Sequence, residues 1–287
     1  MDLVFHRDML TRDGVYTISV EKEDLSRFYP GMIRFVVLVH HGEQTVARFC
    51  TNTYEYSPTV PLRAEHIALE KAYEWEADLS QDTQKFLLSH KIQQRQRSSV
   101  PPTDIAIIQG SPRGGGNCSI LAGWVKTVAE ENNKTARIIY PHDLNIKSCI
   151  GCYQCYNTGT CTFDDDMGEV IDTIRNASLL VICSPVYTNS VPGGLKLLID
   201  RCQAYHAELS ITGQGEQGKK GLTLSVAGRK GRPHFTCVTK VISAFFKNLG
   251  IRPSGEILID GMDELQDIRN IPGLVERIRA IVQDCFR

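Results

Sequence analysis

The chain has 287 residues, of which 42% are hydrophobic and 23% charged, and its formal net charge is −1. This balance is typical of a soluble protein with a substantial core, and the length favours one large or two modest domains. A net charge near zero gives no general attraction to nucleic acid or to anionic membranes.

The first residues do not resemble an export signal, because charged residues such as Asp2, Arg7 and Asp8 interrupt every apolar stretch. No apolar run approaches the roughly 18 residues that span a bilayer. We therefore expect a cytoplasmic protein with no nucleic-acid or membrane partner. Because thiols stay reduced in the cytoplasm, the 10 cysteines are expected to be free or to bind metal.

Residues 1–97 predict a small α+β domain. Segments 15–20 and 33–40 are expected strands, and a helical stripe follows at Ala68, Ala72, Trp75 and Leu79. Ser80 is expected to cap a further helix through Phe86 and Leu87. The scattered histidines, including His40, His41 and His66, are far more often surface or core residues than ligands. Oligomerisation, covering of a cofactor and docking of a redox partner all remain open as roles.

Residues 98–102 predict a linker, because its two prolines favour extended backbone. Residues 103–287 then alternate between apolar strands and amphipathic helices. The expected strands are 104–108, 135–140, 179–183, 222–226 and 257–259; the expected helices are 119–131, 167–174, 192–202, 235–249 and 264–286. This pattern predicts an α/β domain with a doubly wound, five-stranded parallel sheet in the flavodoxin-like order 2-1-3-4-5. Such sheets bind ligands where the loops leave the carboxyl ends of their strands.

The loop after the first strand has the composition of a phosphate-binding turn. Its glycines, Gly116 among them, allow close backbone approach, and the following helix start offers free N–H groups. The candidate phosphate ligands in this loop are Ser111, Arg113, Asn117 and Ser119. Cys118 lies in the same loop, either touching the phosphate or replacing a hydroxyl. The loop has no Walker Gly-Lys-Ser/Thr and no Gly-x-Gly-x-x-Gly in the usual register.

Two further loops are expected at the same edge of the sheet. The one after the third strand contains Pro185, Val186, Tyr187, Thr188, Asn189 and Ser190. Backbone amides there could lie along a flat heterocycle, with Tyr187 as an aromatic wall; an ordinary strand-to-helix turn is the alternative. Gly228 and Arg229, after the fourth strand, would form a third wall.

Four cysteines, Cys149, Cys152, Cys155 and Cys161, fall within thirteen positions between the second strand and the helix at Met167. Thiolates at this spacing can bind a [4Fe–4S] cluster or zinc. Two Cys-x2-Cys steps that share a cysteine favour the cluster, while zinc and free thiols remain open.

Three segments together resemble NAD(P)H-dependent FMN reductases: Gly110-Ser111-Pro112-Arg113 with Gly116-Asn117, Ser184-Pro185-Val186-Tyr187, and the helix ending at Ile199-Asp200-Arg201. The cysteine run ending in 163–167 is similar to the iron–sulfur flavoprotein branch of that family. The resemblance implies FMN with its phosphate at Ser111, Arg113, Asn117, Cys118 and Ser119 and its ring against 185–190. It also implies a [4Fe–4S] cluster on the four cysteines, and homodimers or homotetramers.

The leading hypothesis is an oxidoreductase that relays electrons between the cluster, FMN and a small-molecule acceptor, with a ferredoxin-like protein as the electron donor. The second is an NAD(P)H-dependent reductase of quinones or free flavin that has no cluster. The third is a redox-sensing binding module in which the first domain reports the state of the flavin. No catalytic acid or base is assigned, and Tyr187 and Arg229 are the nearest polar candidates.

Overall fold

The computed structural model describes residues 1–57, 59–60, 62–90, 100–214 and 218–287. The chain forms two compact units, one of Met1–Gln96 with Ile150–Thr162 and the other of Arg97–Cys149 with Phe163–Arg287. The predicted boundaries at 97 and 103 remain a prediction, since part of the proposed linker lies outside the described residues. Within the described part of the chain, no helix is long and apolar enough to cross a bilayer.

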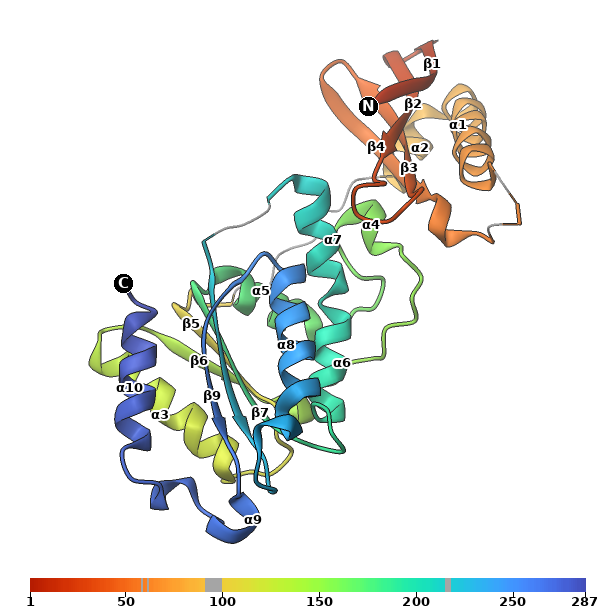
Figure 1. The fold of residues 1–287 in the computed structure, drawn as a ribbon. Helices are drawn as coiled ribbons and strands as arrows, with labels where there is room; N and C mark the ends of the chain where they lie inside the picture. Colours follow the sequence, from red (N-terminus) through yellow and green to blue (C-terminus); the bar gives the residue numbers. More distant parts are fainter. Residues whose placement is uncertain (58, 61, 91–99, 215–217) are drawn as a thin grey trace. The chain divides into compact units, whose positions relative to one another are not determined.

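The first unit contains a four-stranded antiparallel sheet in the order β1-β2-β3-β4 (Figure 1). Its strands are β1 (Asp2–Thr11), β2 (Gly14–Asp24), β3 (Ile33–His41) and β4 (Gln44–Asn52). The 3₁₀ turn η1 (Thr53–Glu55) follows, then α1 (Arg63–Gln81) and α2 (Thr83–Ser89). The one-turn helix α4 (Cys155–Thr158) belongs to the same unit.

Helix α1 covers one face of this sheet because its buried face carries small residues and one tryptophan. Ala68, Ala72 and Trp75 pack against inward-facing Ile18 and Val37 of the sheet. The predicted strands at 15–20 and 33–40 and the helical stripe are confirmed, while β1 and β4, whose exposed charged residues obscure the alternation, were not predicted. The predicted cap at Ser80 is wrong. Asp82 is the cap of α2, and its side chain accepts from the N–H of Lys85.

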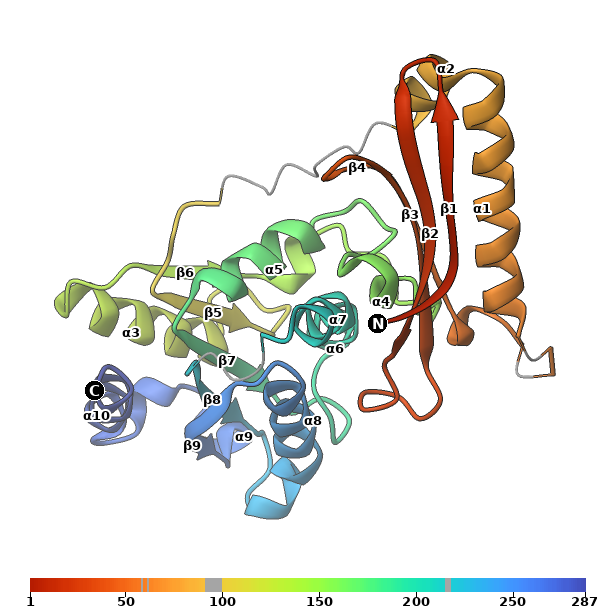
Figure 2. The same ribbon diagram turned by 90° about the horizontal axis from the view of Figure 1, so that it is seen from above.

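The second unit contains a five-stranded parallel sheet in the order β6-β5-β7-β8-β9 (Figure 2). Its strands are β5 (Ile105–Gln109), β6 (Ala136–Ile139), β7 (Leu179–Pro185), β8 (Lys220–Val226) and β9 (Arg252–Ile259). In chain order this is 2-1-3-4-5, so the predicted flavodoxin-like sheet is confirmed. All of β5 is buried, as expected for a strand covered on both faces.

Helices cover both faces of this sheet (Figures 1 and 2). On one face lie α3 (Asn117–Glu131) and α10 (Leu274–Asp284), and on the other lie α5 (Met167–Asn176), α6 (Gly193–Arg201) and α8 (Thr236–Asn248). Shorter elements complete the unit: η2 (Pro141–Asp143), α7 (Gln203–Thr212), η3 (Arg232–Phe235), α9 (Met262–Leu265) and η4 (Ile268–Asn270).

The predicted single helix over 264–286 is wrong. The chain makes the short α9 and η4 first, and α10 begins only at Leu274. Gly273 precedes α10 in the left-handed region at φ 69°, and the proline before it cannot continue a helix. The residues released from the helix form a loop at the carboxyl end of β9.

Candidate functional site

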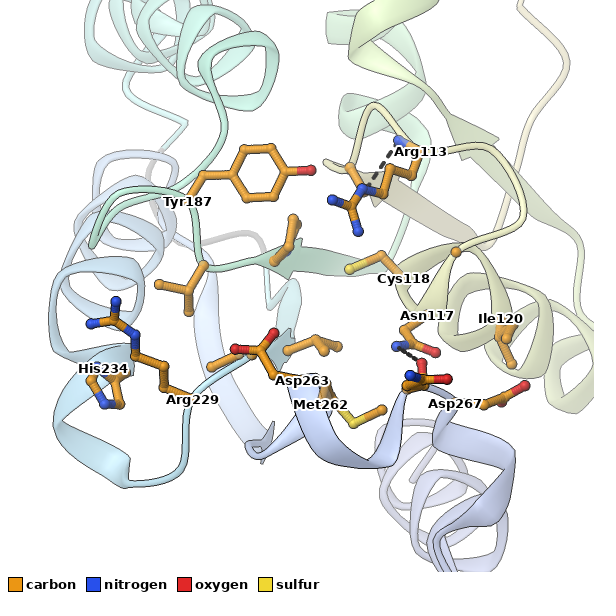
Figure 3. Close-up of a pocket in the computed structure, with 18 of the residues that line it drawn as sticks. Arg113, Asn117, Cys118, Ile120, Tyr187, Arg229, His234, Met262, Asp263 and Asp267 are labelled. Carbon is orange, nitrogen blue, oxygen red and sulfur yellow. Dashed lines mark hydrogen bonds between the residues drawn. The ribbon is translucent and has the colours of Figure 1, made fainter.

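A pocket of about 980 Å³ opens at the carboxyl ends of β5, β7, β8 and β9 (Figure 3). The loops after these strands supply its walls, as the sheet order predicts. The predicted site residues that line it are Ser111, Arg113, Gly116, Asn117, Cys118, Pro185, Val186, Tyr187, Thr188, Asn189, Gly228 and Arg229. Ser119 and Ser190, also predicted, do not line it.

The loop after β5 turns tightly beneath the pocket. The N–H of Gly110 donates to the carbonyl of Cys183 at 2.8 Å, and a Cβ on Gly110 would lie 2.7 Å from a methyl of Leu195. Gly115 takes the left-handed conformation at φ 70°. Helix α3 then begins after Gly116 with no side-chain cap, and Gly116, Asn117 and Cys118 at its start line the pocket together with Arg113. This geometry favours a bound anion.

Ser119 stabilises this loop through two hydrogen bonds. Its hydroxyl accepts from the side-chain amide of Gln109 at 2.8 Å and donates to the carbonyl of Arg113 at 3.3 Å. Ser111 is 8% exposed, and its hydroxyl accepts from the N–H of Arg113. Ser119 therefore contributes to the shape of the loop, and its role as a phosphate ligand stays a prediction.

Asn117 ties the first helix to the loop after β9. Its Nδ2 donates to the carbonyl of Gln266 at 2.9 Å, and its Oδ1 accepts from the N–H of Ile268 at 3.2 Å. Gln266 itself has φ 59° and ψ −43°, a sparsely populated backbone conformation for a residue with a side chain. The Asn117 amide therefore holds a strained wall of the pocket in place.

The thiol of Cys118 is 3% exposed, and burial raises its pKa to about 12. At neutral pH it is therefore a protonated thiol, which lacks the nucleophilicity of a thiolate. The side chain lines the pocket beside Asn117 (Figure 3).

The loop after β7 is a tight hairpin. Tyr187 and Ser190 exchange backbone hydrogen bonds, each 2.9 Å long, and the two residues between them, Thr188 and Asn189, have φ values of 43° and 62°. Positive φ at both central positions is the requirement of a two-residue turn of this hand, and it strains a β-branched threonine. The turn directs the hydroxyl of Tyr187 across the pocket toward Arg113 (Figure 3).

The loops after β8 and β9 form the remaining walls. A Cβ on Gly228 would lie 2.3 Å from a carboxylate oxygen of Asp263, and the Asp263 N–H donates to the Gly228 carbonyl at 3.0 Å. Arg229 and His234 lie together at the end of the pocket away from Asn117 (Figure 3). Within the described residues, Arg113 and Arg229 form no ion pair, so both guanidinium groups remain available to an anionic ligand.

The sequence reasoning missed a whole wall of the pocket. Its residues follow β9 and are Met262, Asp263, Gln266, Asp267 and Arg269. Gln266, Asp267 and Arg269 were assigned to the helix predicted over 264–286, although Gly261 and the Pro272-Gly273 pair were available as signals that this helix is interrupted. Ile120, Val226 and His234 also line the pocket without having been predicted.

The cysteine segment begins and ends in the second unit at a buried ion pair. Arg201 of α6 binds Asp165 with an Nη1–Oδ2 distance of 2.6 Å, and both side chains are 1% exposed. The same Nη1 donates to the carbonyl of Lys147 at 2.6 Å, and the Lys147 N–H donates to Asp165 at 3.0 Å. These bonds hold the residues before Cys149 beside those after Cys161.

The four predicted metal ligands differ in exposure. Cys149 is exposed, Cys152 and Cys161 are half-buried, and Cys155 is buried. Four thiols match the soft-donor chemistry of an iron–sulfur cluster. Among the residues that the structure describes, however, no three or more Cys, His, Asp or Glu side chains are gathered closely enough to hold a metal ion. The donor set fits such a group by its chemistry.

Residues 103–257 match the NADPH-dependent FMN reductase family. An iron–sulfur flavoprotein of Methanosarcina thermophila is 31% identical over 43% of this chain and 62% of its own length. One from Methanocaldococcus jannaschii is 37% identical over 33% of this chain and 49% of its own length. The chain thus spans less than two thirds of either relative.

A solved FMN-dependent NADH-azoreductase from Bacillus anthracis, in complex with FMN, has a TM-score of 0.49 at 14% identity, covering 64% of this chain and 99% of that one. The family match covers strands β5 to β8 and most of β9, the pocket loops after β5, β7 and β8, and the cysteine segment. This chain belongs to the NADPH-dependent FMN reductase family of flavin-dependent oxidoreductases.

Proposed function

We propose that the protein is an FMN-dependent oxidoreductase that relays electrons between a [4Fe–4S] cluster, FMN and a small-molecule acceptor. The observation that carries the flavin assignment is the 980 Å³ pocket at the carboxyl ends of the strands, bordered by the uncapped start of α3. This is the edge at which doubly wound sheets bind nucleotides. The match to an FMN reductase family supports the same cofactor.

The first loop has the groups needed to hold the phosphate end of FMN. The amides of the first turn of α3 and the Arg113 guanidinium converge there, and both stabilise a dianion. Ser111 keeps the loop closed by accepting from the Arg113 N–H. Asn117 contributes through the wall that it holds at Gln266, and those two bonds leave one N–H of its side-chain amide for a ligand.

The other end of the pocket suits a flat ring. Gly228 leaves no room for a side chain beside Asp263, so backbone borders the pocket directly. Tyr187 supplies an aromatic edge that is 36% exposed and so can both cover a ring and admit a second reactant. Arg229 places a positive charge at this end, where it can stabilise negative charge on a reduced ring.

The residues that would hold the cluster are Cys149, Cys152, Cys155 and Cys161. When bound, FMN supplies one- and two-electron chemistry and the cluster supplies one-electron chemistry. The thiols' donor chemistry, their spacing and the similarity to proteins named iron–sulfur flavoproteins support this assignment. Homodimers or homotetramers and a ferredoxin-like electron donor remain predictions.

A second candidate is an NAD(P)H-dependent reductase of quinones or free flavin that holds no cluster. The observation in its favour is the match of residues 103–257 to a family described as NADPH-dependent. The two candidates differ in which donor reduces the flavin rapidly.

Anaerobic stopped-flow absorbance of the FMN-loaded protein separates them. We expect a reduced ferredoxin to bleach the flavin rapidly and NADPH or NADH to bleach it at least about tenfold more slowly. The Cys155→Ser variant should lose the fast ferredoxin reaction and keep the nicotinamide rate. Rapid bleaching by a nicotinamide that is indifferent to Cys155→Ser would instead establish the cluster-free reductase.

A further inference from the structure

The N-terminal sheet shares a compact unit with the segment that carries three of the four clustered cysteines. Residues Ile150–Thr162 group with Met1–Gln96, and helix α4, which begins at Cys155, packs against β4. The contacts that join them are polar and buried, and they involve side chains to which the flavin pocket gives no role.

Arg34 of β3 is a buried cation aimed at this segment. Its side chain is 3% exposed, and its Nη1 donates to the carbonyls of Tyr156 and Asn157 at 3.2 and 3.3 Å. Its Nη2 pairs with Glu23 of β2. The two carbonyls lie in the last turn of α4. Burying a guanidinium is unfavourable unless it is paired and hydrogen-bonded, and α4 and Glu23 supply acceptors for its two terminal nitrogens.

Asn52 and Glu55 form a second set of hydrogen bonds to the same segment. Asn52 is fully buried, and its Nδ2 donates to the carbonyl of Tyr153 at 3.2 Å and to Oδ1 of Asn157 at 2.8 Å. The Asn157 side chain in turn donates to the carboxylate of Glu55. Glu55 also accepts from the backbone N–H of Asn52 at 3.0 Å. Asn52 and Glu55 therefore both form hydrogen bonds with the side-chain amide of Asn157.

The backbone that these residues hold is strained between two cysteines. Tyr153, which follows Cys152, has φ 56°, in the left-handed region that a residue with a side chain seldom adopts. Its ring lies 5.4 Å from that of Tyr29 and 5.0 Å from that of Tyr54. The Tyr29 ring also meets Tyr156 edge-on at 5.3 Å. This aromatic packing and the Asn52 hydrogen bond offset the strain.

We propose that the N-terminal unit is a holder for the cysteine segment, in which Arg34, Asn52 and Glu55 are positioning residues that fix the backbone from Cys152 to Asn157. They touch carbonyl groups and an amide, and they act on the cysteines through the backbone. The identity of the metal rests on the proposed function, whereas the holding itself is a property of the metal-free chain. A domain outside the flavodoxin-like sheet thereby acquires a role in presenting thiols.

The test uses the full-length chain in three variants. Arg34→Met removes the hydrogen bonds from β3 to the carbonyls of Tyr156 and Asn157. Asn157→Ala removes the side-chain hydrogen bonds to Asn52 and Glu55 and leaves the N-terminal core intact. These two are the grip variants. Val37→Ala, which is fully buried on β3 in the core behind α1, is the control for general loosening of the unit.

The first readout is the alkylation rate of each thiol in metal-free protein, measured by peptide mass spectrometry. We expect Arg34→Met and Asn157→Ala to raise alkylation of Cys155 by at least about tenfold, because local opening of one turn exposes it. Val37→Ala should leave that rate within about twofold of wild type, and fully buried Cys183 should stay unreactive in every variant. Equal rates at Cys155 in all four proteins, or an equal rise in all three variants, would overturn the proposal.

The second readout is iron and acid-labile sulfide per chain, beside FMN per chain, in anaerobically prepared protein. We expect the two grip variants to lose at least half of their iron and to keep their FMN, and the control to keep both. Retention of full iron by both grip variants would contradict the holding role. If wild type itself carries no iron, the cluster assignment is wrong. The alkylation rates alone then test whether the N-terminal unit holds the cysteine segment.

Discussion

Arg201 and Asp165 form an ion pair within the second unit, with both side chains 1% exposed and an Nη1–Oδ2 distance of 2.6 Å. Burial by itself would raise the pKa of Asp165. Hydrogen bonds from Arg201 and from the N–H groups of Lys147 and Met167 outweigh it, and the pKa is lowered. The pair therefore fixes both chain segments that flank the four cysteines.

Breaking this pair should destabilise the protein strongly. Asp165→Ala leaves the Arg201 guanidinium buried without its carboxylate, and such a change costs about 3–5 kcal/mol. Asp200→Ala, on the same helix, breaks an exposed pair with Lys196 and should cost less than about 0.5 kcal/mol. Urea unfolding of the two variants measures both values, and similar losses would contradict the importance of the buried pair.

The same carboxylate predicts an acid-side loss of stability. Because the folded pKa of Asp165 lies below the ordinary value of 3.8, its contribution to stability is fully present above that value and is lost as pH falls through the folded pKa. Unfolding free energies of wild type and Asp165→Asn should therefore converge as the pH falls from about 5 to below the folded pKa of Asp165. A constant difference across that range would contradict the assignment.

Arg113 should distinguish FMN from riboflavin. Removing the guanidinium with Arg113→Gln takes away a charge-assisted contact of about 1.5–3 kcal/mol, so FMN should bind roughly ten- to a hundredfold more weakly. Riboflavin lacks the phosphate, and its affinity should change by less than about twofold. Fluorescence titration of the apoprotein measures both, and an equal loss for the two ligands would place the phosphate elsewhere.

Asn117 should stabilise the pocket wall that the loop after β9 forms. Asn117→Ala removes both hydrogen bonds to the loop at Gln266 and Ile268 and releases a strained backbone, so the loop should open locally. Hydrogen exchange of the amides from Asp263 to Asn270 should accelerate by about tenfold or more, with α8 unchanged as an internal reference. Unchanged exchange in this loop would show that other contacts hold it.

Gly228 should not tolerate a side chain. In Gly228→Ala, the new Cβ meets the Asp263 carboxylate at 2.3 Å and pushes apart the walls after β8 and β9. We expect FMN affinity to fall by about tenfold or more, in line with the 1–3 kcal/mol of overpacking. Gly114→Ala, in the first loop, meets nothing within 4 Å and should bind FMN as wild type does. Equal affinity of the two variants would remove Gly228 from the site.

Much of the second unit could be predicted because its strands are continuous apolar runs separated by helices of the correct period. The strand order and three of the pocket walls followed from that pattern. The wall after β9 did not, since the apolar spacing of 264–286 is helical and the break depends on a few backbone conformations around Gln266 and Gly273. Ser119 was assigned to the pocket by its residue type, whereas the structure turns its hydroxyl toward Gln109.

The first unit was harder to predict. Its outer strands β1 and β4 carry charged residues and lack a clean alternation, so only the two inner strands were predicted. The partnership between Arg34 and the carbonyls of α4 joins residues 122 and 123 positions apart. No local spacing signals a contact at that separation, because it depends on the folded path of the chain.

The most direct test of the electron-relay assignment is the absorption spectrum of anaerobically purified protein, with iron and acid-labile sulfide assayed on the same sample. We predict flavin bands over a broad shoulder that dithionite bleaches, with about four irons and four sulfides per chain. Flavin bands without iron or sulfide would contradict the relay and leave the nicotinamide-dependent reductase. Absence of bound or bindable FMN would contradict the flavin site itself.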